Sequence, residues 1–219
     1  KGKLDSLFDL AGAKLDITLS SAHPGPLLRL LGIHELRQGA ININARIENQ
    51  TAGELYEFHI DGSVAGVEVR VDGNTQDILT LDPIEASFMV SGPSLYEAGA
   101  LFNELRLTAA PFLASGEFSF SGSSLDIPAL NVQLEQGTME ISATAPALPD
   151  TEGLQLTITA NQFKPNFLKP LADTCELTAE PMDVDAEITL TGNGQQVLIE
   201  TRSRSLQLKA QGTINDSPG

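Results

Sequence analysis

Few side chains in this sequence have the types and spacings that carry out chemistry. His23, His34 and His59 have no second metal-ligating residue at a short spacing, and His59 lies within an alternating run of apolar and polar residues. Cys175 is the only cysteine, so it has no CxxC partner and cannot form an internal disulfide. We therefore expect the histidines and the cysteine to be structural or solvent-exposed.

Three carboxylates, Asp183, Asp185 and Glu187, alternate along one run and could in principle hold Ca²⁺. Alternate residues of a strand lie about 6–7 Å apart, which is wide for one ion, so we expect a solvated face here. The sequence contains no nucleophile elbow, P-loop, dinucleotide-binding or zinc-protease motif. It thus predicts no enzyme activity, no metal ion and no cofactor.

The charge balance restricts the partners. Lys and Arg number 13 and Asp and Glu number 29, which gives a formal net charge of −16. A strongly acidic chain is poorly suited to neutralise nucleic-acid phosphates or to adsorb on anionic lipid head groups. No apolar run approaches the roughly 20 residues of a membrane-spanning helix. The chain opens at Lys1 without a signal peptide, and we interpret it as an internal or C-terminal piece of a longer protein.

Apolar and polar residues alternate with a period of two along much of the chain, and this alternation predicts the strands that position the residues named above. In residues 40–48, Ile41, Ile43, Ala45 and Ile47 are separated by polar residues. The same pattern recurs in residues 14–20, 67–72, 130–135, 139–143, 154–158, 182–190 and 206–210. Alternation predicts antiparallel strands with one apolar and one wet face. We expect about 13–16 strands covering more than half of the chain. Turn-forming residues predict hairpin turns at 49–53, 61–63, 72–74, 122–124, 136–137 and 192–194.

Three short stretches interrupt the alternation in the same way. Each carries a proline near its start, at Pro26, Pro93 and Pro165, and proline suits the first turn of a helix. We expect helices at 26–31, 94–102 and 165–172. Their spacing predicts an internal repeat of about 70 residues, with copies at approximately 14–83, 84–153 and 154–219 of one continuous β-rich fragment.

The second copy carries a resemblance to a known family. Residues 86–95 run from a strand into a Gly92-Pro93-Ser94-Leu95 helix start, and residues 105–120 lead into a strand around Ser115-Gly116. A hairpin follows at 127–134 and 137–144, its second arm beginning at Gly137. This pattern resembles the AsmA-like family, the periplasmic repeat proteins of the AsmA, TamB and YhdP type. The resemblance implies a periplasmic protein of a Gram-negative bacterium, anchored in the inner membrane, whose strongly curved, taco-like β-groove carries phospholipid acyl chains between the two membranes.

The predicted fold class is all-β with a few short helices, either an open antiparallel β-groove or a closed β-sandwich. In the sandwich, the apolar faces are simply the core between two sheets. In the groove, they stay open for acyl chains, and the low aromatic content of 5% favours this alternative. The predicted lipid-facing residues are Ile17, Leu19, Ile41, Ile43, Ile47, Val67, Val69, Phe88, Phe118, Phe120, Ile141, Leu156, Ile158, Val184, Ile188 and Leu208.

Three functions remain open at this point. The first is a segment of a lipid conduit that binds phospholipid acyl chains and supports outer-membrane integrity, without being an enzyme. The second is a scaffold that assembles outer-membrane barrel proteins by β-augmentation. The third, a carbohydrate-binding or adhesive β domain, is disfavoured because such sites need aromatic platforms, and the chain has no Trp and only Tyr56 and Tyr96.

Overall fold

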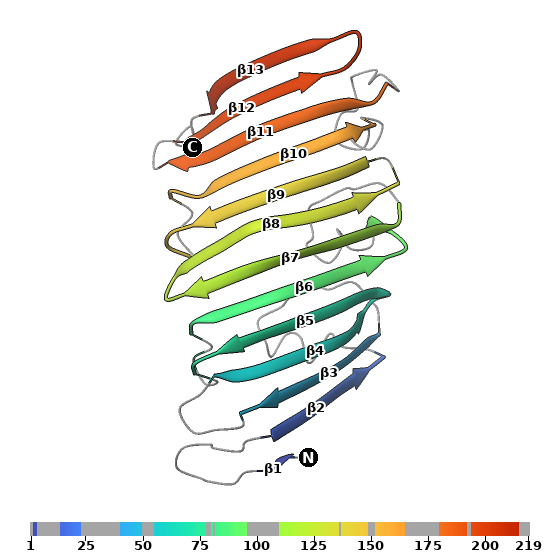
Figure 1. The fold of residues 1–219 in the computed structure, drawn as a ribbon, viewed down its shortest axis with the longest axis vertical. Coiled ribbons are helices and arrows are strands. Elements are labelled where there is room, and N and C mark those ends of the chain that lie inside the picture. The colour runs from blue at the N-terminus through green and yellow to red at the C-terminus, as the bar shows by residue number, and fades with distance from the viewer. Residues whose placement is uncertain are drawn as a thin grey trace. The chain divides into compact units, whose positions relative to one another are not determined.

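Alternating residues form the expected strands in the computed structural model. The structure describes residues 2–3, 14–22, 40–49, 55–77, 80, 82–95, 110–135, 137–148, 152–164, 180–191 and 194–214. The chain divides into two compact units, Lys1–Leu113 and Ala114–Gly219. Unit 1 contains strands β1 (Gly2–Lys3), β2 (Lys14–Ser21), β3 (Ile41–Glu48), β4 (Tyr56–Val64), β5 (Val67–Thr75) and β6 (Ile84–Gly92). These strands pair in chain order, each antiparallel to its neighbours (Figure 1).

Unit 2 is built in the same way. Strand β7 (Phe112–Ser121) begins in unit 1 and runs into unit 2. It is followed by β8 (Ser124–Leu134), β9 (Gly137–Ala145), β10 (Gln155–Phe163), β11 (Met182–Thr191), β12 (Gly194–Arg202) and β13 (Gln207–Ile214). Strands β8 to β13 again pair antiparallel with their neighbours in the chain (Figure 1). The expectation of an all-β, antiparallel fold is confirmed.

Each unit presents one open sheet among its described residues. No second described sheet packs on either one, so the described strands do not form the two layers of the closed sandwich. The predicted helices at 26–31 and 165–172 lie outside the described residues, as does the helix at 94–102 beyond its first two residues. The three-copy repeat stays a prediction.

Two of the predicted turns are wrong. Strand β4 runs through Asp61–Ser63, and β5 runs through Asp72–Asn74. The chain instead reverses at Ala65 and Gly66, where both residues have positive φ values of 52° and 85°. The turn at 122–124 is confirmed, because β7 gives way to β8 there. The predicted turns at 49–53, 136–137 and 192–194 include residues outside those that the structure describes.

The glycine that suggested a turn at 61–63 has a different role. A β-carbon on Gly62 would lie 2.1 Å from the carbonyl oxygen of Asn42 and 2.7 Å from the Cα of Ile43. Both are backbone atoms of β3 and cannot swing away. Gly62 thus allows β3 and β4 to approach closely at this point.

Gly62→Ala is therefore expected to lower the free energy of unfolding of unit 1 by about 2 kcal/mol, the cost of overpacking a backbone contact. The matched control is Gly212→Ala in β13, where an added β-carbon meets nothing within 4 Å. Chemical denaturation followed by circular dichroism measures both variants. Equal stability of the two would contradict the close approach.

Several of the best-buried apolar residues of unit 1 lie together at one end of its strands. Ile41 and Val67 are 3% and 2% exposed, and both flank the β4–β5 turn through their pairing with Val64. Phe112 is buried and lies beside Gly92, where a β-carbon would be 2.9 Å from its ring. This end of the sheet is therefore closed by side chains of unit 1 itself.

Unit 2 contains a bulge in β10. The register of β10 with β11 shifts between Ala160 and Phe163, and Gln162 lies there in the left-handed region with φ of 52°. The backbone N–H of Gln162 donates to the Asp183 carboxylate at 2.9 Å. Phe163 next to it is buried. The carboxylate of Asp183 thus stabilises a backbone conformation that a non-glycine residue rarely adopts.

Candidate functional site: the apolar face of each unit

The strand register determines which side chains of unit 1 share a face. Residues that pair directly across antiparallel strands lie on the same face of a sheet. Leu19 pairs with Ile43, Ile43 with Gly62, and Gly62 with Val69. Following all the pairings places eight of the predicted residues on one face of unit 1: Ile17, Leu19, Ile41, Ile43, Ile47, Val67, Val69 and Phe88.

This face is closed at the end where Ile41 and Val67 lie and is more open over the rest of its length. Ile43, Val69 and Phe88 in the middle of their strands are half-buried. On β2, Leu15 and Ile17 are 42% and 46% exposed. Ile41 and Val67, by contrast, have almost no exposed surface, so the accessible apolar surface of unit 1 lies away from this end.

An aromatic ring lies over the sheet near the other end of the strands. A β-carbon on Gly73 would lie 2.5 Å from Cζ of Phe58 and 2.7 Å from the Cβ of Ala86. The ring of Phe58 therefore fills the space that a side chain at Gly73 would occupy. Between this ring and the buried end at Val67 lie two cross-strand rows of aliphatic residues, one ending at Phe88 and one at Val90.

Unit 2 has a corresponding apolar face. Ile141 pairs with Ile158, Leu156 with Ile188, and Val184 with Thr201, which in turn pairs with Leu208. The predicted residues Ile141, Leu156, Ile158, Val184, Ile188 and Leu208 thus share one face of unit 2. Phe118 and Phe120 are half-buried and lie on one side of β7, opposite Glu117 and Ser119.

Several residues of these faces escaped the sequence analysis. Ile60, Val71 and Val90 lie in the middle rows of unit 1, because Ile60 pairs with both Ala45 and Val71, and Val90 pairs with Val69. The mistaken turn at 61–63 cut the alternating run that would have identified Ile60, and continuing the alternation through Gly62 would have found it. Val71 lies in the alternating run 67–72 but was not among the predicted lipid-facing residues.

The opposite face of unit 1 is mostly polar, and its charges on β2 and β3 form ion pairs. Arg46 Nε donates to Asp16 Oδ1 at 2.9 Å, and Lys14 Nζ donates to Glu48 Oε1 at 2.7 Å. All four belong to β2 and β3. Of the polar residues that alternate with the apolar ones, Asn42, Asn44, Glu68 and Arg70 in unit 1 and Gln133, Asp185 and Glu187 in unit 2 are exposed, and Asp183 in unit 2 is half-buried.

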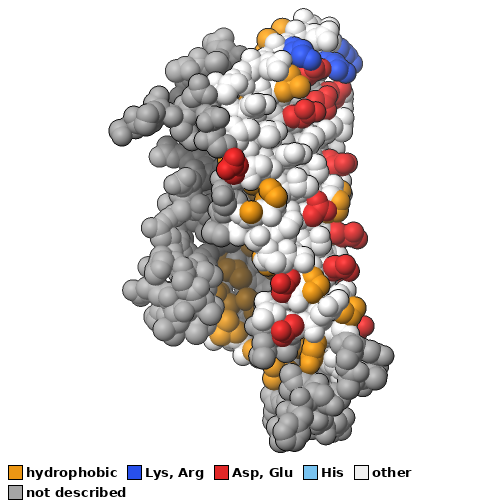
Figure 2. Space-filling view, turned by 90° about the vertical axis from the view of Figure 1, so that its left-hand side faces the viewer, with side chains coloured by type: hydrophobic (Ala, Val, Ile, Leu, Met, Phe, Trp, Pro, Cys, Tyr) orange, Lys and Arg blue, Asp and Glu red, His pale blue; other side chains and the backbone are white. Residues whose placement is uncertain are grey.

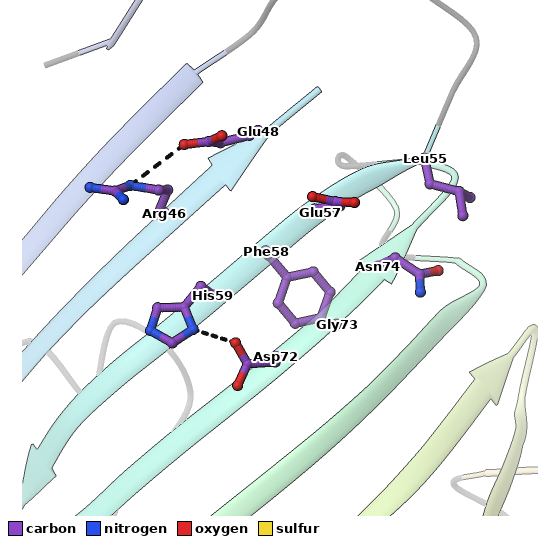
Figure 3. Close-up of a pocket in the computed structure, with 9 residues that line it drawn as sticks. All are labelled: Arg46, Glu48, Leu55, Glu57, Phe58, His59, Asp72, Gly73 and Asn74. Atoms are coloured by element: carbon purple, nitrogen blue, oxygen red, sulfur yellow. Dashed lines mark hydrogen bonds and ion pairs between the residues drawn. The ribbon is translucent and has the colours of Figure 1, made fainter. Parts of the chain in front are cut away.

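A shallow depression of about 570 Å³ lies on strands β3 to β5 (Figure 3). In it, the imidazole of His59 bonds the carboxylate of Asp72 through Nδ1, and its Nε2 lies 3.4 Å from Asp61. Arg46 lies 3.6 Å from Glu48 across the same depression. These charged groups bond one another, and His59 is therefore part of a surface network, as expected for a structural histidine.

The ion pairs make stability depend on pH in a defined direction. The hydrogen bond from Arg46 holds the pKa of Asp16 below its usual 3.8, and the one from Lys209 holds the pKa of Glu200 below its usual 4.5. A carboxyl whose pKa is lower in the folded state binds more protons when unfolded. The contribution of such a carboxyl to the free energy of unfolding is therefore complete above its pKa in the unfolded state. This contribution is lost as the pH falls through its pKa in the folded state.

Glu200→Gln is accordingly expected to reduce the loss of stability between about pH 6 and pH 3. Asp16 is exposed and Glu200 is partly exposed, so the effect is small and shrinks further in high salt. Urea unfolding at several pH values measures it. Glu187→Gln is the control, because Glu187 has no ion pair among the described residues. A pH profile changed by the control and unchanged by Glu200→Gln would contradict the assignment.

The remaining candidates for chemistry lie elsewhere. His23, His34 and Cys175 lie outside the described residues. Within the part of the chain that the structure describes, no group of three His, Cys, Asp or Glu side chains is arranged to hold a metal ion. Asp183 bonds Gln162, and Asp185 pairs with Glu200, which carries the same charge. Among the described residues, the surface best suited to bind a ligand is the apolar face, whose side chains suit an apolar ligand.

Among the residues that the structure describes, no helix is long and apolar enough to cross a membrane. Comparison with protein-family models, with curated proteins and with solved structures finds no match to this chain.

Proposed function

We propose that this chain is a lipid-binding segment of a longer AsmA-like protein, whose apolar faces hold phospholipid acyl chains. One observation carries the proposal: strands β2 to β6 place only aliphatic, glycine and aromatic side chains in the two middle rows of one face. Those side chains are half-buried or exposed, and no second described sheet covers them. An apolar surface of this extent needs a ligand or a partner.

An acyl chain fits the chemistry of these rows. Each buried CH₂ group contributes about 0.8 kcal/mol, so ten of them contribute roughly 8 kcal/mol before the cost of ordering the chain. The rows contain no charged or hydrogen-bonding side chain that would orient a sugar or a peptide. The polar face, with its share of the net charge of −16, keeps the segment in water.

In the proposed setting, the longer protein is anchored in the inner membrane of a Gram-negative bacterium and spans the periplasm. Phospholipid then moves along the apolar face between the membranes, and the segment acts by binding, without enzymatic chemistry. This setting rests on the resemblance of residues 86–95, 105–120 and 127–144 to the AsmA-like pattern.

Lipid extraction of the purified protein tests the proposal. The chain is produced in the periplasm of a Gram-negative host, purified without detergent and examined by native mass spectrometry and by mass spectrometry of the extracted lipids. We expect glycerophospholipid to co-purify in near-stoichiometric amount. A lipid-free protein that also fails to take up phospholipid from vesicles would overturn the proposal.

A further inference from the structure

Two phenylalanine rings lie over glycines on the apolar face of unit 1. The ring of Phe58, on β4, reaches over β5, because a β-carbon on Gly73 would lie 2.5 Å from its Cζ and 2.7 Å from the Cβ of Ala86. The ring of Phe112 lies over Gly92 on β6, where a β-carbon would be 2.9 Å from its Cε1. A glycine in a sheet leaves room that a neighbouring ring can cover. Each ring therefore occupies space above the sheet that would otherwise be open.

Burial along β5 changes in step with these rings. Val67 and Thr75, near the two ends of β5, are 2% and 0% exposed, whereas Val69 and Val71 between them are half-buried. All four share a face, since alternate residues of a strand point to the same side. Figure 2 shows apolar side chains gathered at the level of β4 to β6, on the side of the sheet away from the carboxylates. Over β5 and β6, the apolar face is thus closed on both sides and open along the two rows through Val69 and Val71, which we call the lane.

The lane has the width of two acyl chains. Alternate residues of a strand lie about 6–7 Å apart, so two rows span about 13 Å. Apolar carbon atoms pack about 4 Å apart, so an extended acyl chain with its zigzag takes up about 5 Å. Two chains therefore fit side by side between the rings of Phe58 and Phe112, and a third does not.

The two rings also limit the direction of a bound chain. With C–C bonds of about 1.5 Å, an extended palmitoyl chain reaches roughly 19 Å, which is longer than the lane is wide. A chain that lay along a strand would therefore run into the ring over Gly73 or the ring over Gly92. A chain that crosses the strands follows a row of aliphatic side chains and meets neither ring.

We propose that Phe58 and Phe112 are specificity-determining residues, which limit unit 1 to two acyl chains lying side by side across the strands. The lane then accepts one lipid with two acyl chains, or two molecules with one chain each. Lipids with four or more acyl chains exceed its width. This inference rests on the proposed function and adds to it the number of chains, their direction and the side chains that set both.

The first test counts single-chain ligands. Palmitate is titrated into the whole chain after bound lipid has been removed, and native mass spectrometry gives the number of molecules bound at saturation. Phe58→Ala removes the ring over Gly73 and so adds a third row to the lane. We expect this variant to bind one palmitate more than the unchanged protein. Unit 2 contributes equally to both numbers.

Phe88→Ala is the matched control. Phe88 is also a half-buried ring on this face, but it lies within the lane, where it pairs with Val71. Its loss deepens the lane without widening it, so the number of bound palmitate molecules should stay the same. Should Phe58→Ala disturb the fold, Phe58→Leu replaces it, because leucine keeps apolar bulk but lacks the ring carbon that lies over Gly73. It should show the same gain.

The second test reads the direction of the chain. Two palmitate analogues carry a photoreactive diazirine, one at a middle carbon and one at the last carbon, and mass spectrometry of peptides maps their adducts. We expect the two analogues to react within the same two rows but on different strands. Adducts that move along a single strand, past Gly73 or Gly92, would overturn the inference.

The outcomes separate this inference from the proposed function. A protein that binds neither palmitate nor phospholipid contradicts the proposed function itself. Palmitate binding that does not increase in Phe58→Ala or Phe58→Leu, or that increases equally in Phe88→Ala, overturns the role of the rings and leaves the proposed function standing.

Discussion

A glutamate at position 43 is expected to remove bound phospholipid from unit 1 while leaving its sheet folded. Ile43 lies in a middle row of the apolar face and is half-buried. A carboxylate there must either lose its water against an acyl chain or exclude the chain, and either costs several kcal/mol. Because each 1.4 kcal/mol is a factor of ten, lipid occupancy of unit 1 should fall by at least tenfold. The same carboxylate can stay hydrated when no lipid is present, so the free energy of unfolding should change by only about 1 kcal/mol.

The matched control is Asn44→Glu, one residue further along β3 and on the polar face. It adds the same charge to the same strand and should retain its lipid. Extracted lipid and the urea midpoint are measured for both variants. Collapse of the fold by Ile43→Glu would show that this face is only a core, and equal lipid loss in both variants would show that net charge alone is responsible.

Val67→Asp is expected to unfold unit 1. Val67 is 2% exposed and lies in the closed end of the sheet, beside Gly92 and Phe112. An aspartate there would be buried without a partner, which costs about 4 kcal/mol or more and is a large part of the stability of a small unit. Hydrogen exchange of peptides from β3 to β5 should show loss of protection throughout.

Val69→Asp separates the closed end from the open middle. Val69 lies two residues further along β5 on the same face, is half-buried, and pairs with Gly62 and Val90. We expect it to lose lipid with a much smaller loss of stability than Val67→Asp. Unfolding by both variants to the same extent would contradict the division of this face into a packed end and a binding middle.

The strands could be predicted from the sequence because apolar residues in runs such as 40–48 and 182–190 recur at every second position, which does not fit the period of a helix. The alternation also predicted which side chains share a face, since every predicted lipid-facing residue of β2, β3 and β5 lies on one side of the sheet. The turns were harder. Gly62 and Gly73 look like turn residues beside aspartates, but one lies against the backbone of β3 and the other lies beneath Phe58.

The degree of burial along the face could not be predicted. Val67 and Val69 are identical in type and phase, yet Val67 is 2% exposed and Val69 is half-buried. Val67 lies at Gly92 together with the ring of Phe112, a residue far along the chain. The bulge at Gln162 likewise depends on the register that brings Asp183 opposite it. The local sequence pattern predicts neither the burial of Val67 nor the register that places Asp183 opposite Gln162.

Photo-crosslinking along β3 tests the central claim most directly. A photoreactive amino acid is placed in turn at positions 42 to 47, the protein is irradiated in the periplasm of the producing cell, and covalently attached phospholipid is detected by mass spectrometry. If acyl chains lie on the apolar face, lipid adducts form at Ile43, Ala45 and Ile47 and are absent at Asn42, Asn44 and Arg46. Adducts at none of the six positions, or at all of them equally, would contradict the account.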